Sequence, residues 1–361
     1  MIKIDWDTMP NLSELTLVVP TYNRQNYALR QLHFWFNTPV KIHILDGTSN
    51  PIDTKDLKSL GENVHYYHLP CSYEERLRKA LELVDTPYVA LLCDDEFFIP
   101  CALKHCIDEL KTHKELMACI GRCLGFYSTK RGIMAAPMYN EMKGYGCFGA
   151  IAKERMIKHM NPYVCSTTYA VQRSEAWKKS IEILTKGKFS SPYVGELQFE
   201  LATCYQGNSM VIEDLMWLRN MKNRPIDFTK WNRKLQFDTW IKDPSYGAEV
   251  KLFYDNTATE LAKIDGADEE TVLKDFKLAV GAYLDYCKKR RHIFSAATLR
   301  DQIMQFVPEQ LKMQMQSTRI SSTWKPIMDG AKIMQKEGVT VDMKQIHEIV
   351  EFIKKDKGYE L

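Results

Sequence analysis

Three acidic residues, Asp94, Asp95 and Glu96, stand together directly after the apolar run at residues 88–93. Carboxylate oxygens are the ligands that Mg²⁺ and Mn²⁺ prefer, and such cations usually take only one or two of them from the protein, with phosphate oxygens and water filling the other positions. A cation held there could stabilise the charge of a departing diphosphate. Alone, the triplet is explained equally well as a solvated loop or as a cap for the next helix.

Polar residues also follow two earlier apolar runs. The run at residues 15–20 leads into the segment Pro20, Thr21, Tyr22, Asn23 and Arg24, and the run at residues 40–45 ends in Asp46 and Gly47. If these runs are parallel strands, their carboxyl ends lie at one edge of a sheet, where ligands of open α/β sheets bind. The three strand ends together favour a ligand site over a solvated loop.

The elements that would position these residues alternate between strand and helix along the first hundred residues. The spacing of apolar residues predicts a helix over 25–36, a strand over 64–69 and an amphipathic helix over 72–84. This alternation is typical of an α/β fold with a parallel sheet of nucleotide-binding type. Further predicted elements are helices 102–110, 175–184 and 196–205 and strands 117–126, 134–150 and 209–212.

Beyond about residue 224 the pattern becomes mainly helical, with helices predicted over 249–264, 269–289, 296–306 and 343–355. We therefore expect a catalytic domain over residues 1–224 and a mainly helical C-terminal extension over residues 225–361. This extension is also the expected surface for a homo-oligomer.

The motifs resemble those of family 2 type glycosyltransferases with the GT-A fold. The similar segments are residues 17–24, 44–49, 91–96, 166–173 and 195–202, so the resemblance covers about residues 15–219. It implies a mixed, mainly parallel sheet with flanking helices and a hexosyltransferase-like enzyme of polysaccharide biosynthesis. The implied donor is a nucleotide-diphosphate sugar, UDP-sugar first, and the implied acceptor is a glycan or a lipid-linked molecule.

The resemblance assigns roles to single residues. Asp94 and Glu96 would hold Mn²⁺ or Mg²⁺, and Asp95 would face the donor. The residues expected to bind the nucleotide sugar are Pro20, Thr21, Tyr22, Asn23, Arg24, Asp46, Gly47, Arg78, Asp94 and Asp95. Arg78 is included because it lies on the predicted helix 72–84, which precedes the strand that leads to the triplet. The triplet departs from the family pattern, because its last member is a glutamate rather than the commoner aspartate.

An inverting transferase also needs a base on the face of the sugar opposite the leaving diphosphate. Glu196 is the candidate by resemblance, although Gly195 stands where the family usually has a second acid. Glu196 could instead only cap its helix. Glu200, one helical turn later, and the pair Glu213 and Asp214 could also serve as the base.

Other chemical groups carry weaker signals. His65 and His68 lie three apart on a predicted strand and so point to opposite faces, which excludes them as joint zinc ligands. The ten cysteines lack zinc-site spacing and are interpreted as reduced thiols. The basic residues Arg76, Lys79, Arg219 and Lys222 could meet phosphate, and the aromatic residues that could form the floor of a sugar site or belong to the core are Trp231, Phe237, Trp240, Tyr246, Phe253 and Tyr254.

Composition limits the partners. The net charge of +3, from 49 basic and 46 acidic residues, is too small to favour nucleic acid. With no export signal and no apolar span, we expect a cytoplasmic protein. The basic run at residues 287–292 either ends a helix in solvent or contacts the inner face of a membrane.

Two further functions are compatible with parts of this pattern. A nucleotidyltransferase also combines an α/β sheet with metal-binding carboxylates, but no glycine-rich phosphate loop with a following lysine comes after the first strand. A non-catalytic sugar-binding or scaffold protein could be built on the same fold.

Overall fold

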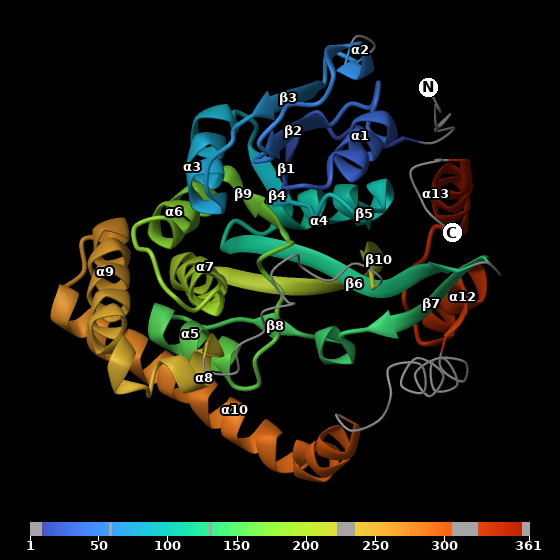
Figure 1. Cartoon of the computed structure of the whole chain (residues 1–361). Helices are drawn as coiled ribbons and strands as arrows, with labels where there is room; N and C mark the ends of the chain where they lie inside the picture. Colours follow the sequence, from blue (N-terminus) through green and yellow to red (C-terminus); the bar gives the residue numbers. More distant parts are fainter. Residues whose placement is uncertain (1–8, 58–59, 130–131, 222–234, 305–323, 356–361) are drawn as a thin grey trace.

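The computed structural model describes residues 9–57, 60–129, 132–221, 235–304 and 324–355, and it gives no side-chain detail for residues 291–304. An eleven-stranded mixed sheet runs through this part of the molecule, with helices on both of its faces (Figure 1).

The half of the sheet that contains the first four strands is parallel, as the sequence predicts. Its strand order is β3-β2-β1-β4, and all three of its strand pairs are parallel. The strands β1, β2 and β4 are almost wholly buried because both of their faces are covered, whereas the edge strand β3 is mostly half-buried. The strands are β1 (Leu15–Thr21), β2 (Lys41–Asp46), β3 (Val64–His68) and β4 (Tyr88–Leu91).

The other half is mixed. The short strand β9 (Val171–Arg173) lies antiparallel between β4 and the long strand β6 (Leu116–Thr129), and β6 pairs in parallel with β10 (Asn208–Asn220). The remaining strands pair antiparallel at the margins: β5 (Phe97–Phe98), β7 (Gly132–Met138), β8 (Gly146–Cys147) and β11 (Lys325–Pro326).

Two strand predictions in this half are wrong in extent. The predicted strand 134–150 is divided into β7, a 3-10 turn at Asn140–Met142 and β8, and Gly144 after the turn has a positive φ of 63° that a strand does not allow. The predicted strand 209–212 extends to residue 220, because the polar residues Glu213 and Asp214 are accommodated where the pairing of β10 with β6 is irregular.

Helices cover both faces of the sheet. Leu17 and Val19 on β1 face a core that contains α1 (Gln25–Phe34) and α4 (Pro100–Thr112), and Val18 faces a core with α3 (Tyr73–Leu83) and α6 (Ser174–Leu184). The short helix α2 (Thr54–Leu57) follows β2. The predicted helix over 72–84 is α3, which begins with a reciprocal capping box between Ser72 and Glu75.

A second core lies beside the sheet and is built mainly from helices, with Cys147 of β8 among its buried residues. The helix α7 (Tyr193–Gln206) packs there on α5 (Ala152–Met160), which the sequence analysis missed, and on α9 (Gly247–Asp265). The helices predicted over 269–289 and 296–306 form one helix, α10 (Glu269–Met304), which follows the edge of this core (Figure 1). The short helix α8 (Phe237–Trp240) completes it.

The last described segment returns to the main sheet. Helices α12 (Ile327–Lys336) and α13 (Met343–Lys355) join the core on the α1 and α4 face, where the ring of Phe352 meets those of Phe34 and Phe97 at 5.3 and 6.3 Å. The predicted domain boundary at 224/225 falls outside the described residues. Beyond it, the helical extension is divided between the second core and the main sheet.

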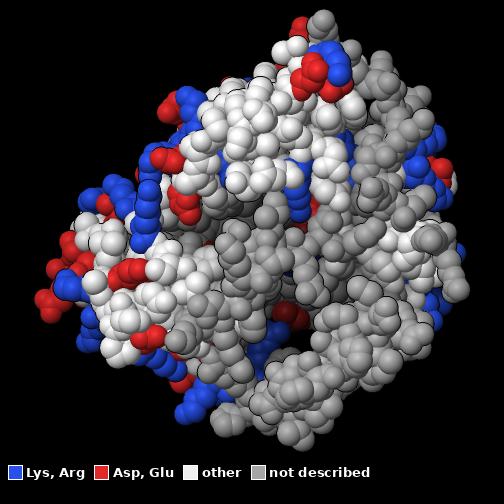
Figure 2. All heavy atoms as spheres, in the orientation of Figure 1, with Lys and Arg blue, Asp and Glu red and all other residues white. Residues whose placement is uncertain are grey.

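Charged side chains of both signs are interspersed on the visible surface near α3, α6 and α9 (Figure 2). This mixture fits the small net charge and forms no one-sign patch on that edge. Among the described helices, none combines the length and the apolarity that crossing a membrane requires.

Candidate active site at the carboxyl ends of the strands

The three predicted strand ends do meet at one edge of the sheet. Thr21 and Asp46 are partners in the register of β1 and β2, and the amide of Gly47 donates to the carbonyl of Thr21 at 2.9 Å. From β1 the hydroxyl of Thr21 donates to Asp94 Oδ2 at 2.6 Å. Hydrogen bonds therefore join the ends of three strands at the edge where the sequence predicts a ligand site.

Asp46 is fully buried, and three donors hold its carboxylate. The amide of Thr48 donates to Oδ1 at 2.8 Å, and Gln25 Nε2 and the Tyr66 hydroxyl both donate to Oδ2 at 2.7 Å. Burial alone would raise the pKa of Asp46, but these hydrogen bonds outweigh it and lower the pKa. Asp46 is thus an ionised acceptor in a fixed orientation.

Arg76 reaches the same strand ends from α3. Its Nη1 donates to the carbonyl of Leu45 at 3.2 Å and also to the carbonyl of Thr21. A side chain at Gly47 would place its Cβ only 2.7 Å from Cζ of Arg76, so glycine is required for this close approach. Arg78, which the sequence analysis chose, lies instead on the exposed side of α3 and donates to the carbonyl of Thr185 at 2.7 Å.

The loop after β1 carries three more predicted residues. Tyr22 is exposed, and Asn23 adopts a positive φ of 54°, with its amide donating to Thr48 Oγ1 at 2.9 Å. This turn sends the side chain of Arg24 to the acidic triplet. Pro20 is partly buried within β1 beside Leu45 and contributes backbone rather than a polar group.

Arg24 connects the first two acids of the triplet. Its guanidinium forms an ion pair with Asp94 and a second with Asp95 at 3.3 Å. Asp94 is fully buried, and burial raises its pKa to about 6 although Arg24 and Thr21 oppose the rise. Asp94 and Asp95 therefore share one cation.

Glu96 turns to the opposite side, toward β10. Its Oε2 accepts from Trp217 Nε1 at 2.6 Å, and its Oε1 lies 3.7 Å from Nε of Arg219. Arg219 also lies over the rings of Tyr139 and Trp217, at 5.3 Å from each centroid. Burial raises the pKa of Glu96 to about 8, and the nearby Asp95 adds to this effect.

Gln31 on α1 fixes the backbone of the triplet. Its Nε2 donates to the carbonyls of Asp94 at 3.0 Å and Glu96 at 2.6 Å, and its Oε1 accepts from Trp35 Nε1 at 3.1 Å. All three partners are buried, so the loop has little freedom. The sequence analysis missed Gln31, although a glutamine among the apolar residues of a buried helix face is a visible signal.

Glu196 lines a cavity of about 250 Å³ together with Tyr73, Thr168 and Tyr169. The hydroxyl of Tyr169 is 3.4 Å from Sγ of Cys93, and its ring packs on Trp217 with centroids 4.7 Å apart. Since Trp217 also donates to Glu96, Tyr169 links the lining of the cavity to the triplet, although none of the three acids lines the cavity itself.

Glu196 lines this cavity, and its carboxyl group has Tyr163 and Glu200 as neighbours. Its Oε1 accepts from the Tyr163 hydroxyl at 2.6 Å. Burial of the carboxyl group and the neighbouring Glu200 raise the pKa of Glu196, and the hydrogen bond from Tyr163 partly offsets them. A carboxylate with a raised pKa in an open cavity has the properties of a general base.

Glu200, the second candidate for the base, has a structural role. It is fully buried and lies 2.7 Å from Nε2 of His159, and it accepts at 2.6 Å from the hydroxyls of Thr167 and Thr168. Burial would raise the pKa of Glu200, but these partners lower it. The carboxylate thereby fixes residues 166–168 against α7.

Glu213 and Asp214, the last two candidates for the base, also have structural partners. Glu213 pairs with Arg122 at 2.6 Å, and Asp214 pairs with His105 at 2.7 Å. Each carboxylate is therefore engaged on β10 rather than directed to the cavity that Glu196 lines.

The weaker sequence signals form no site of their own among the described residues. The ring of His65 stacks on His43, and Nε2 of His68 lies 2.7 Å from the carbonyl of Thr48, so these two residues hold no joint site. The aromatic group of residues 237–254 belongs to the second core. Trp231 and Lys222 lie outside the described residues.

Comparisons with known proteins agree with this geometry. The family model described as Glycosyl transferase family 2 matches residues 16–181, the segment that contains all three strand ends. A search of curated proteins found no match.

Several solved structures are similar in shape. The complex of S. aureus TarS 1–349 with UDP-GlcNAc is 12% identical and has a TM-score of 0.49, covering 75% of this chain and 73% of that chain. A mannosyltransferase, PcManGT from Pyrobaculum calidifontis, in complex with GDP-Man and Mn²⁺ is 11% identical with a TM-score of 0.38, covering 78% and 90%. At TM-scores below 0.5, neither likeness carries weight for the chemistry of this chain.

The family match and the strand order β3-β2-β1-β4 confirm the GT-A fold that the motifs predict. Residues 16–181 of this chain match the model of glycosyl transferase family 2, and the protein is a glycosyltransferase.

Proposed function

We propose that the protein is an inverting glycosyltransferase that moves a sugar from a nucleotide-diphosphate donor to a hydroxyl group of a glycan or lipid-linked acceptor. The observation that carries this proposal is the position of Glu196 in a cavity whose lining residue Tyr169 packs on Trp217, the hydrogen-bond partner of Glu96. Such an arrangement has an anion-binding end and a proton-accepting end, which an inverting displacement requires.

The donor end consists of the strand-end residues. Asp46 is ionised and oriented, as suits an acceptor for nucleoside N–H or O–H groups. Arg24 and Arg76 supply positive charge at the same edge, where a diphosphate would lie. We keep UDP-sugars as the first donors to test and GDP-sugars as the second.

The donor atoms and the charge of the triplet suit a divalent cation, but Glu96 turns toward Trp217 while Thr21 and Arg24 hold Asp94, so the two carboxylates would have to turn toward each other to share the ion. Three carboxyl groups stand against the two cations Arg24 and Arg219, and both Asp94 and Glu96 have raised pKa values, so added positive charge would be favourable. Asp94 and Glu96 are the proposed ligands for Mn²⁺ or Mg²⁺. When bound, the cation would neutralise charge on the diphosphate.

At the acceptor end, Glu196 would take the proton of the attacking hydroxyl. The hydrogen bond from Tyr163 orients one carboxylate oxygen of a residue that lines the cavity. Protonation of Glu196 would remove the base, so transfer should fall as the pH falls through its raised pKa.

The test separates binding from transfer. Purified protein is screened with UDP- and GDP-sugars and Mn²⁺, first by thermal shift and then by release of the nucleoside diphosphate with and without acceptor sugars. Asp94→Ala should lose the stabilisation by nucleotide and Mn²⁺. Glu196→Gln should keep this stabilisation and lose about 10²–10⁴-fold in transfer.

The matched control is Glu82→Gln, a similar change on the exposed side of α3. It should resemble the parent in both assays. Full transfer by Glu196→Gln would exclude Glu196 as the base. If the parent binds nucleotides but neither transfers nor hydrolyses any donor, a non-catalytic sugar-binding function gains support.

We also propose a location for the protein and an assembly. A cytoplasmic protein with a peripheral contact to the inner membrane face would suit a lipid-linked acceptor. The proposed contact is the basic run at residues 288–291, which lies in the interior of α10 and not at a helix end as the sequence predicts. We further propose that the helical extension forms the contact of a homo-oligomer. Vesicle co-sedimentation and light scattering test the two separately.

A further inference from the structure

A cluster of three soft ligands lies in the second core, apart from the acidic triplet. Cys147 on β8, His159 on α5 and Cys204 on α7 are buried, and their ligand atoms all lie within 4.8 Å of one another. Within the described ranges, no other group of three or more His, Cys, Asp or Glu side chains converges in this way.

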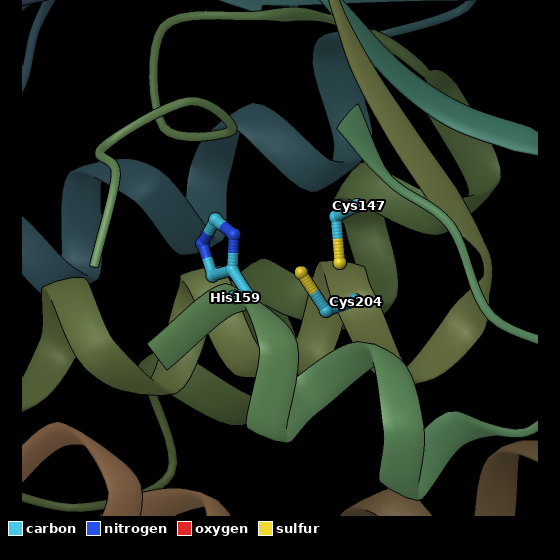
Figure 3. A group of neighbouring side chains, drawn as sticks. All are labelled: Cys147, His159 and Cys204. Carbon is cyan, nitrogen blue, oxygen red and sulfur yellow. The ribbon is translucent and has the colours of Figure 1, made fainter. Parts of the chain in front are cut away.

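Figure 3 shows the two sulfur atoms turned toward each other and the imidazole ring beside them. Three separate elements supply the side chains. Thiolate and imidazole ligands favour Zn²⁺ among the common biological cations, and carboxylate sites such as the triplet do not.

The orientation of His159 is already that of a metal ligand. Its Nε2 pairs with the carboxylate of Glu200 at 2.7 Å, and this partner leaves Nδ1 as the ligand atom. Metal-bound histidines typically donate their second ring N–H to a carboxylate in this way. Nδ1 lies 2.6 Å from the hydroxyl of Tyr145, so zinc would replace this hydrogen bond and the hydroxyl would lie beside the ion as a neutral fourth ligand.

Charge also balances around the cluster. Two thiolates would neutralise the charge of Zn²⁺. The negative charge of the Glu200 carboxylate then needs a positive charge nearby. Arg155 is buried beside the cluster, and its guanidinium donates to the carbonyls of Gly149, Cys204 and Tyr205 at 3.0, 2.8 and 2.6 Å. A carboxylate and a guanidinium then flank a neutral metal centre.

We propose that Cys147, Cys204 and His159 bind one Zn²⁺ ion, with the Tyr145 hydroxyl as the fourth ligand. Binding releases two protons from the ligands to solvent and forms two Zn–S bonds, one Zn–N bond and one bond to the neutral tyrosine oxygen, with no change of oxidation state. The hydrogen bond that Cys147 Sγ donates to the Arg155 carbonyl at 3.2 Å is lost when the thiol ionises.

The site would act at a distance on the transferase chemistry. It ties α5 and β8 to α7, the helix that also carries Glu196, and through Glu200 it orders Thr167 and Thr168 beside the cavity. Zinc here is a structural ion, because the cluster is closed to solvent and is separate from the carboxylates that would bind Mn²⁺ or Mg²⁺.

The test measures metal content in the full-length protein. Chain purified under reducing conditions and dialysed against Zn²⁺ should hold about one zinc per chain by elemental mass spectrometry. The double variant Cys147→Ser/Cys204→Ser should lose nearly all of it. The matched control, Cys71→Ser/Cys287→Ser, removes two partly buried cysteines outside the cluster and should keep it.

A second measurement stays valid if the double variant fails to fold. Parent protein loaded with Co²⁺ instead of Zn²⁺ should show thiolate-to-cobalt charge-transfer absorption, which mercurial titration of the thiols should abolish with release of the metal. Parent protein without zinc and without this absorption would overturn the proposal. A Cys147–Cys204 disulfide in protein purified without reductant, together with no zinc uptake after reduction, would also overturn it.

Discussion

Replacing Glu96 by glutamine should remove a pH-dependent loss of stability from the protein. Glutamine keeps the acceptor for Trp217 Nε1 and the size of the side chain, but it carries no charge. The parent has a buried carboxyl whose pKa is raised from 4.5 to about 8 in the folded state. The folded protein therefore holds this proton more tightly than the unfolded chain does.

The sign follows from this difference. A raised carboxyl pKa contributes no destabilisation below about pH 4.5, and the folded state then loses stability as the pH rises from 4.5 to about 8. Each pH unit in this window costs about 1.4 kcal/mol, so the free energy of unfolding falls by about 3 kcal/mol by pH 7 and by about 5 kcal/mol above pH 8.

The assay is urea denaturation between pH 4.5 and 8.5 with a chelator present. Glu96→Gln and the parent should agree at pH 4.5, and the variant should be more stable by a few kcal/mol at pH 8. The control Glu82→Gln should follow the parent throughout. Parallel curves for the parent and Glu96→Gln would refute the reasoning, because Glu96 would then ionise as readily in the folded protein as in the unfolded chain.

Three further predictions concern the groups that support the site. Glu200→Ala leaves His159 without its buried partner and should cost about 3–5 kcal/mol in urea denaturation; a loss below about 1 kcal/mol would contradict a structural role for Glu200. Ser72→Ala removes the capping box of α3 and should cost about 1 kcal/mol, measured in the same way, whereas Ser72→Asp should retain most of the stability. Gly47→Ala should cost about 1–3 kcal/mol through the contact with Arg76. In a double-mutant cycle with Arg76→Ala, additive losses would show that this contact is not the cause.

Glu196 and Glu200 illustrate why sequence alone could not choose the candidate base. Both are acids on one turn of the same helix, and their spacing gives them equal reach. The packing of α5 and of the segment at residues 166–168 against α7 surrounds Glu200 with donors, and Glu196 remains at the cavity. Such partners come from distant segments, so no local pattern contains them.

Local sequence patterns were sufficient to locate those elements whose structure depends on neighbouring residues. Buried parallel strands are apolar runs that end in polar turns, so β1, β2, β4 and the strand-end residues Asp46 and Asp94 could be located from the sequence. The capping box at Ser72 and the start of α3 are local for the same reason.

The tertiary structure alone decided the directions of the side chains and the groupings that cross elements. It turned Glu96 toward Trp217 while Asp94 and Asp95 share Arg24, and it placed Arg76, not Arg78, over the strand ends. It also assembled Cys147, His159 and Cys204 from three elements whose sequence spacing contains no metal motif. The sequence determined where the polar strand ends of the sheet lie, because that depends on neighbouring residues; the partners of each charge depend on packing between segments far apart in the chain.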